Sequence, residues 1–460
     1  MKTGRQRVAA GMTIAHPRTN QTLRRYPPGV SGARPEAAAA AAPRGRRTLA
    51  GYLAMPRPKD LFKALLMPVT FGLGALANGG VSGQALLRAV VVLAVLELMV
   101  YPARYQWNDI RGFAADQRHP AEKDRGRLPG PLQNGRRHVV ASSLVAAARL
   151  ALTAVIALLP GLHLGGVLLA MTVGVFGVAV AYEALRAVAT GRSGAVPPRI
   201  TVGLVLLWLT VGAGYVVRGL TGLALAVDLG HRPALGVAAA VTLWAYGVAF
   251  VTCRWAIEAT AFARLHGDRV TWSAEAGHAR EHLLGLVRWL PTRVDSRSFT
   301  GPHQRNTTSW AALRGGTTMS APWNLAMILA GAAAALTGQL LTAPPTVAQA
   351  MVVALLGGLA AAGVATVTAT RARLLAVAIG AALLLTGFAL QSAGAPVVAL
   401  LPWLAVAIAY VYFVGHSMRT MGLLGRRVRA GLGHLLAPVA RLAMGRETWV
   451  VLTAAERADG

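Results

Sequence analysis

The feature that most constrains this chain is a series of long apolar runs that recurs along almost its whole length. About 20 consecutive apolar residues suffice to cross the hydrocarbon core of a bilayer as an α-helix, since that core is about 30 Å thick. We count ten runs of this kind. They are residues 61–80, 84–105, 138–160, 163–186, 199–222, 234–262, 322–342, 346–369, 373–391 and 396–416.

Composition agrees with a membrane protein. The mean hydropathy is +0.50, and 55% of the 460 residues are hydrophobic, which is too apolar for a water-soluble chain. A transmembrane barrel would need alternating segments of about ten residues, and the sequence has none. We therefore predict an all-α, polytopic transmembrane helical bundle of about nine or ten spans.

The connections between the predicted spans fall into two alternating sets. Arginine is abundant in one set, while the other carries few or no charged residues. The arginine-rich connections are 1–60, 106–137, 187–198, 263–321, 370–372 and the segment after 417. Because basic loops stay on the cytoplasmic side, we expect both termini and the loop at 106–137 to be cytoplasmic. A bacterial cytoplasmic membrane is the expected location.

Three regions follow from this division. Residues 1–50 are rich in Ala, Pro, Gly and Arg and predict a disordered basic tail. Residues 51–417 form the predicted transmembrane domain, which includes the long cytoplasmic loop at 263–321. Within that loop, Trp272 to Leu290 has the pattern of an amphipathic helix, either on the membrane surface or as a lid over a cavity. Residues 418–460 are predicted to be a basic, amphipathic tail on anionic lipid.

The formal net charge is +29, which raises the question of a nucleic-acid partner. The basic residues are spread over many loops and form no patch interleaved with aromatic residues, so nucleic-acid binding is not expected. Orientation in the membrane and an anionic substrate or leaflet explain the charge better. No feature calls for an obligate protein partner. The single cysteine, Cys253, lies in an apolar run and excludes a disulfide within the chain.

One cytoplasmic stretch, Tyr105 to Gly130, is dense in both acidic and basic residues, although Asp and Glu number only 17 in the whole chain. If the preceding helix continues past Asn108, then Asp109 and Asp116 lie two turns apart on one face. Three basic residues follow, namely Lys123, Arg125 and Arg127. Two carboxylates ahead of several cations suit a Mg²⁺-bound diphosphate. The alternative is an ordinary basic loop that only orients the protein.

The same stretch resembles a known family. Its acidic residues, His-Pro pair, arginine and glycine keep a fixed spacing, at Asn108-Asp109, Asp116, His119-Pro120, Arg125 and Gly130. This pattern is similar to the first Asp-rich motif of the UbiA-type membrane prenyltransferases, and most similar to the subgroup that makes decaprenylphosphoryl phosphoribose. It departs from the family at Gly112, where an acid is usual, and at Gly126, where proline is usual.

The resemblance extends over about residues 57–260 and implies further residues that bind the diphosphate. Lys63 follows an Arg57-Pro58 pair as in the phosphoribose subgroup. Tyr182 and Arg186 resemble a pair that faces the diphosphate, and Arg254 lies where that subgroup has a basic segment. The family's second Asp-rich motif is missing after the sixth predicted span.

For function, the resemblance implies transfer of an isoprenyl group from an allylic diphosphate to an acceptor. Asn108, Asp109 and Asp116 would then be the catalytic residues, with Mg²⁺ held by Asp109 and Asp116. Two other reactions fit the same family fold, namely cyclisation of a prenyl diphosphate and phosphoribosyl transfer to a polyprenyl phosphate. A transporter without chemistry is the alternative from another class. The sequence has no Walker A loop, Gly-x-Ser-x-Gly elbow, His-Glu-x-x-His or Rossmann fingerprint.

Overall fold

The structure is a computed structural model of the chain. The residues it describes are 48–57, 63–117, 127–130, 132–191, 195–272, 281–295, 298–299, 306–391, 394–421, 423, 431, 437, 438, 441 and 442. The predicted tails at 1–50 and 418–460 lie mostly outside these residues, as do Lys123 and Arg125.

Within the described residues, nine helical segments are long and apolar enough to cross a membrane, as expected of an integral membrane protein. The first runs from Gly83 to Arg111 and consists of α3 (Gly83–Ala94), a π-helical stretch (Val95–Val100) and α4 (Tyr101–Arg111). The others are α7 (Gly135–Ala157), α8 (Gly165–Ala189), α9 (Val202–Ala226), α10 (Pro233–Ala259), α12 (Pro322–Thr342), α13 (Val347–Thr366), α14 (Thr370–Leu390) and α15 (Pro396–Val414).

The first predicted span, 61–80, is shorter in the structure. Its apolar helical stretch runs from Lys63 to Ala77 and contains α2 (Leu66–Ala77). Gly79 and Gly80 follow with φ values of +71° and +132°, which are conformations that favour glycine and end the helix. The other nine predicted runs each coincide with one of the nine long segments.

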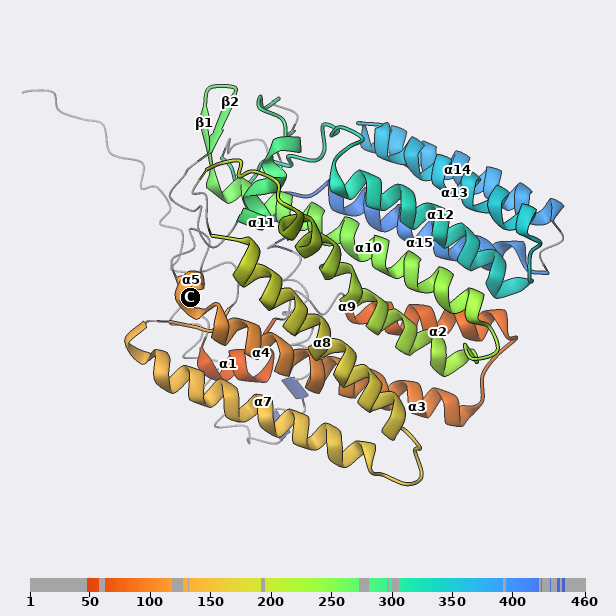
Figure 1. Cartoon of the computed structure of the whole chain (residues 1–460), viewed down its shortest axis with the longest axis horizontal. Coiled ribbons are helices and arrows are strands. Elements are labelled where there is room, and N and C mark those ends of the chain that lie inside the picture. The colour runs from red at the N-terminus through yellow and green to blue at the C-terminus, as the bar shows by residue number, and fades with distance from the viewer. Residues whose placement is uncertain are drawn as a thin grey trace, which may run out of the picture.

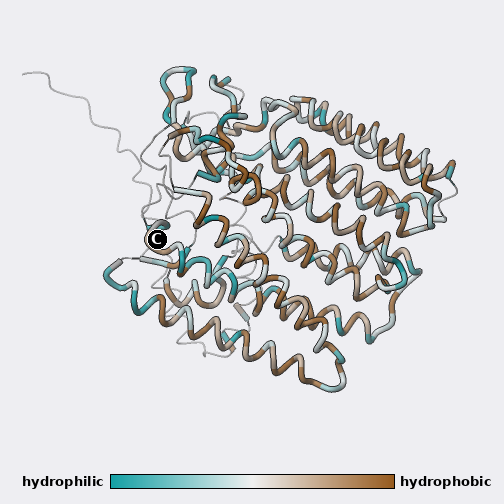
Figure 2. Tube along the Cα trace, viewed as in Figure 1, coloured by the Kyte–Doolittle hydropathy of each residue, from teal (hydrophilic) through white to brown (hydrophobic). Residues whose placement is uncertain are grey.

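The helices run back and forth between the two ends of one bundle (Figure 1). The short helices α5 (Phe113–Gln117) and α11 (Glu281–Leu284) lie at one end, at the left of Figure 1, and α1 (Leu49–Ala54) lies beside α4 and α7 in the same half of the bundle. The helix ends that flank the arginine-rich connections at 106–137, 187–198, 263–321 and 370–372 lie at that end, and those that flank the weakly charged connections lie at the other. Hydrophobic residues dominate the long helices, whereas hydrophilic ones gather toward the helix ends and the connections (Figure 2).

The long connection at 263–321 differs from its prediction. The described part begins with an antiparallel hairpin, in which β1 (Ala263–His266) pairs with β2 (Arg269–Trp272), whereas residues 273–280 of the helix predicted from Trp272 to Leu290 lie outside the described residues. Helix α11 and a 3₁₀ turn (Gly285–Trp289) follow. Residues 281–287 are all buried, and the indole Nε1 of Trp208 in α9 donates to the His282 carbonyl at 2.9 Å. Residues 281–287 of the predicted helix therefore pack on the bundle.

Two helices of the second half of the bundle meet at a glycine. A Cβ atom on Gly338 of α12 would lie 1.7 Å from the carbonyl oxygen of Ala399 in α15. Helices that cross at such a small residue bring their backbones into contact, which is a main source of stability inside a bilayer. By contrast, a Cβ atom on Gly363 of α13 would meet nothing within 4 Å.

This contrast predicts opposite effects for two identical substitutions. Gly338→Ala should force α12 away from α15 and destabilise the protein by about 1–3 kcal/mol. Gly363→Ala should be neutral or stabilise by up to about 1 kcal/mol through helix propensity. Thermal unfolding of both variants in the same detergent measures the difference. Equal melting temperatures for the two variants would contradict the observed packing.

Candidate functional site

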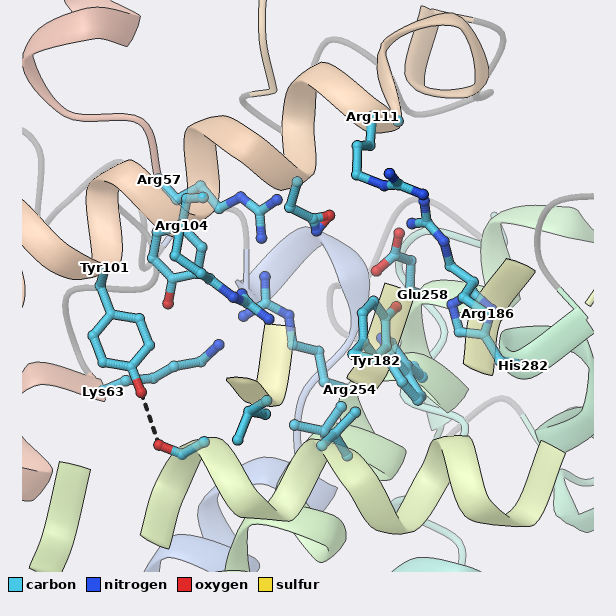
Figure 3. A pocket seen from close by; sticks show the side chains of 18 of the residues that line it. Arg57, Lys63, Tyr101, Arg104, Arg111, Tyr182, Arg186, Arg254, Glu258 and His282 are labelled. Atoms are coloured by element: carbon cyan, nitrogen blue, oxygen red, sulfur yellow. Dashed lines mark hydrogen bonds between the residues drawn. The ribbon is translucent and has the colours of Figure 1, made fainter. Parts of the chain in front are cut away.

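A cavity of about 520 Å³ opens among α4, α8, α9, α10 and α11. It lies on the side of the bundle where the Asp-rich stretch and the described part of the long loop converge. Figure 3 shows its basic and aromatic side chains pointing toward a common space from several helices.

The cavity is strongly basic for a site among membrane-spanning helices. Among the described residues, eight basic side chains line it, but only two acidic ones do, Asp116 and Glu258. The basic residues are Arg57, Lys63, Arg104, Arg111, Arg127, Arg186, Arg218 and Arg254. Ionisable groups within a membrane bundle are costly and usually mark a functional site. An excess of guanidinium groups favours an anionic ligand such as a phosphate or diphosphate.

Most residues singled out in the sequence come together here. The lining includes Asn108, Asp116, Lys63, Arg127, Tyr182, Arg186 and Arg254. The positions of Lys123 and Arg125 fall outside the described residues. Asp109 does not line the cavity and lies directly behind its wall.

The Asp109 carboxylate is completely buried and receives three hydrogen bonds. Arg57 donates a short hydrogen bond to Oδ1, and Arg127 Nη1 donates to the same oxygen at 2.8 Å. The hydroxyl of Tyr52 donates to Oδ2 at 3.2 Å. Burial is the main cause that raises the pKa of Tyr52 above its ordinary value, and the nearby Asp109 charge raises it further. Tyr52 therefore keeps its proton and stays a donor to Asp109.

The buried carboxylate of Glu183 on α8 likewise binds two arginines. Oε2 of Glu183 accepts a hydrogen bond from Arg111 Nε at 3.2 Å and lies 2.8 Å from Arg186 Nη2. The Arg111 side chain is 47% exposed, so this pair of guanidinium groups lies at the mouth of the cavity. Figure 3 shows Arg111 and Arg186 side by side there.

On α9, Arg218 is held by a carboxylate and by an aromatic ring. Its Nε and Nη2 donate to the two carboxylate oxygens of Glu97 at 2.6 and 3.0 Å. Its guanidinium lies 3.4 Å from the ring centroid of Tyr101, and the Tyr101 hydroxyl donates to the Gly214 carbonyl at 2.8 Å. Charge pairing and a cation–π contact thus hold this arginine in one geometry.

Aromatic rings and a carboxylate line the part of the cavity next to α11. The Trp255 ring lies 4.7 Å from the His282 ring and 6.3 Å from the Tyr182 ring. Glu258 follows Trp255 by three residues and Arg254 by four, so all three share one side of α10. This part of the cavity combines flat apolar surfaces with groups that can exchange protons.

These contacts leave a magnesium ion few carboxylate ligands. Within the described part of the chain, no group of three or more His, Cys, Asp or Glu side chains could hold a metal ion. The oxygens of Asp109 already accept hydrogen bonds from Tyr52, Arg57 and Arg127. Asp116 and Asn108 do line the cavity, and one carboxylate with substrate phosphates and water is a usual environment for Mg²⁺. The residues therefore fit an ion that is shared with a bound diphosphate, with Asp116 as its carboxylate.

A second, apolar groove lies beside the cavity. It measures about 190 Å³ and runs between α2, α9, α10, α12 and α15. Lys63 and Tyr215 line both spaces, so they mark the junction. At the far wall lie apolar side chains such as Leu223, Ala239 and Leu341. Leu65 and Val69 also line the groove and are 60% and 45% exposed, so the groove opens toward the surroundings of the bundle.

Several lining residues were missed in the sequence. Arg104 and Arg111 flank Asn108 at spacings of four and three residues, so helical periodicity could have assigned them to the same face. Trp255 is the residue after Arg254 and was not considered. His282 lies in the long loop, and nothing in its local sequence distinguishes it from the other histidines.

No protein-family model, no curated protein and no solved structure matches this chain. The likeness to the UbiA-type prenyltransferases therefore stays a prediction from the residues of the Asp-rich stretch.

The two aspartates are expected to respond differently to substitution. Asp109→Asn removes the buried charge between Arg57 and Arg127, and loss of one partner of a buried ion pair costs about 3–5 kcal/mol. Activity should fall by about two orders of magnitude or more, and the melting temperature should fall with it. Asp116→Asn should lower activity and apparent Mg²⁺ affinity while leaving the melting temperature near that of the parent. Full activity of the parent in excess chelator would contradict a magnesium role.

The resembled family usually has an acidic residue at the position of Gly112, and substitutions there test whether an added carboxylate would bind Mg²⁺. Its Cβ would lie 3.3 Å from both the Asn108 carbonyl oxygen and Oδ2 of Asp116, so an added side chain starts beside the remaining carboxylate. Gly112→Asp should tighten apparent Mg²⁺ affinity or leave it unchanged. Gly112→Asn, which has the same shape without the charge, is the control. Equal loss of activity in both variants, with an intact fold, would show that the position requires glycine.

Proposed function

We propose that this protein is an intramembrane transferase that takes an isoprenyl group from an allylic diphosphate and passes it to an acceptor. The observation that carries the proposal is that two unlike spaces lie side by side and share two lining residues, Lys63 and Tyr215. The basic cavity suits a diphosphate, and the apolar groove suits a hydrocarbon chain. An amphiphile with an anionic head and an apolar tail is the ligand that matches this shape.

In the proposed reaction, the bond between the prenyl C1 atom and the diphosphate oxygen breaks, and the electron pair leaves with the diphosphate. Arg57, Arg127 and Arg218 are held in place by Asp109 and Glu97, so they can stabilise the departing charge without reorganising. Bound Mg²⁺ would add positive charge at the leaving group. It would be held by Asp116 and Asn108 together with the diphosphate oxygens.

The allylic cation then needs protection from water. Tyr215 also lines the cavity, and the face of such an aromatic ring attracts a cation. The apolar side chains of the groove exclude water that would otherwise capture it. The nucleophilic atom of the acceptor forms the new bond to C1 and releases its proton. Glu258 and His282 line the cavity and are the groups proposed to accept that proton.

The proposal also includes the orientation of the protein in the membrane. The cavity lies at the bundle end to which the arginine-rich connections return, and the positive-inside rule assigns that end to the cytoplasm. The substrate diphosphate would then be taken from the cytoplasmic side of a bacterial cytoplasmic membrane, while its chain enters from the lipid.

The test is incubation of purified protein in lipid nanodiscs with Mg²⁺ and a panel of prenyl diphosphates, with and without acceptors. Products are identified by mass spectrometry. We expect turnover that depends on an acceptor and a product that carries the mass of both substrates. A cyclic terpene from the diphosphate alone would establish a cyclase instead. Consumption of phosphoribosyl diphosphate together with a polyprenyl phosphate would establish phosphoribosyl transfer. Counterflow of substrate without a covalent product would establish a transporter.

Substitutions in the apolar groove test whether it binds the prenyl chain. Ala239 is buried and lines the groove, so Ala239→Phe should fill it and lower turnover of the longer prenyl diphosphates by about tenfold or more. The shortest substrates should be less affected. Val237→Phe on the same helix is the matched control, because Val237 is 65% exposed and does not line the groove. Equal loss of turnover in both variants at every chain length would argue against binding of the prenyl chain in this groove.

A further inference from the structure

The segment before the first long helix enters the bundle as a separate element. We call residues 48–57 the N-terminal strap. It begins at Thr48, whose hydroxyl accepts from Gly51 N and caps α1, and it ends at Arg57, which lines the cavity. Tyr52, in the middle, is fully buried and packs with Phe113 and Leu128.

The strap lies within the span of α7 rather than beyond its end. Gln106 of α4 donates to the Ser142 carbonyl of α7 at 3.0 Å, about two turns inside that helix. Arg149, a further two turns along α7, donates a short hydrogen bond to the side-chain oxygen of the same Gln106. Figure 1 shows α1 beside α7 and α4.

Ending a helix at this depth leaves carbonyl groups without helical partners, and lipid offers no donor to them. In the structure, Arg149 supplies the donors. Its Nη2 donates to the Leu53 carbonyl at 2.7 Å and to the Ala54 carbonyl at 3.0 Å, which are the last two residues of α1. A guanidinium group is also favoured at a helix C-terminus by the negative end of the backbone dipoles.

We infer that Arg149 is a positioning residue that anchors the N-terminal strap and thereby holds Arg57 in the cavity. Only two residues separate Ala54 from Arg57, so the anchor fixes where the Arg57 guanidinium can reach. That guanidinium pairs with Asp109 and lies 4.6 Å from the Tyr105 ring. Arg149 therefore acts on anion binding through Arg57, a role that rests on the proposed function only in taking diphosphate as the ligand.

The anchor can be measured without enzyme activity. Cys253 is the only cysteine in the chain, so Cys253→Ala gives a background for spin labels at Ala50→Cys and Leu355→Cys, both at exposed positions. Pulsed electron paramagnetic resonance should give one narrow distance distribution in this parent. Arg149→Met should broaden it, and Arg149→Lys should restore part of the order, since lysine can still donate to carbonyls. Arg88→Met is the matched control, because Arg88 also donates to a backbone carbonyl, that of His163, but not to the strap.

Binding of inorganic diphosphate to the same proteins tests the link to Arg57. Arg149→Met and Arg57→Gln should each weaken binding about tenfold, the size expected for a charge-assisted hydrogen bond. The double variant should be no weaker than Arg57→Gln alone, and Arg88→Met should bind like the parent. An unchanged distance distribution in Arg149→Met, or additive losses in the double variant, would overturn the inference. A parent that binds no diphosphate would contradict the proposed function, while the distance result would still decide whether Arg149 anchors the strap.

Discussion

The structure depends on pairing charges inside an apolar bundle. A buried guanidinium or carboxylate is strongly destabilising alone and tolerable when paired and hydrogen-bonded. Asp109, Glu183 and Glu97 each hold one or two arginines at the cavity wall. Because these carboxylates hold the arginines from behind, the guanidinium groups keep fixed positions while the cavity as a whole stays basic. Preorganised cations of this kind are what stabilisation of a departing diphosphate requires.

The second constraint is the match between polar and apolar space. The basic cavity alone would suit many phosphates, and the apolar groove alone would suit many lipids. Because Lys63 and Tyr215 line both spaces, we propose a ligand with an anionic head directly attached to a hydrocarbon tail. The N-terminal strap adds Arg57 to the basic cavity, so this cavity is complete only when a short element outside the long helices is in place.

Much of the architecture could be predicted because lipid imposes a simple rule on sequence. A helix must be long and apolar to span the bilayer, so nine of the ten predicted runs recur as helices with nearly the same ends. The segment from Trp272 to Leu290 was predicted as one helix because its hydrophobic residues have helical spacing. In the described part of that segment, Leu283, Leu284, Leu286 and Val287 are buried in the bundle core, and spacing alone does not tell contact with protein from contact with lipid.

The residues of the candidate site could be predicted only in part. Acidic residues are rare in this chain, so Asp109 and Asp116 stood out, and Asp116 lines the cavity. The sequence did not indicate that Asp109 faces Arg57 and Tyr52, because these partners lie more than 50 residues away and meet it only through the strap. Arg149 also takes its role from tertiary contacts, and Glu183 does so in part, because Arg111 comes from another helix whereas Arg186 lies three residues along the same one. No local pattern marks a residue whose partners come from other helices.

The central claim is that one ligand fills both the basic cavity and the apolar groove. Isothermal titration of the protein in nanodiscs with farnesyl diphosphate, inorganic diphosphate and farnesol tests it most directly. If both spaces are occupied together, farnesyl diphosphate should bind about 100-fold or more tightly than either fragment, because head and tail then contribute to one binding event. Affinity for farnesyl diphosphate no greater than that for inorganic diphosphate would contradict the claim.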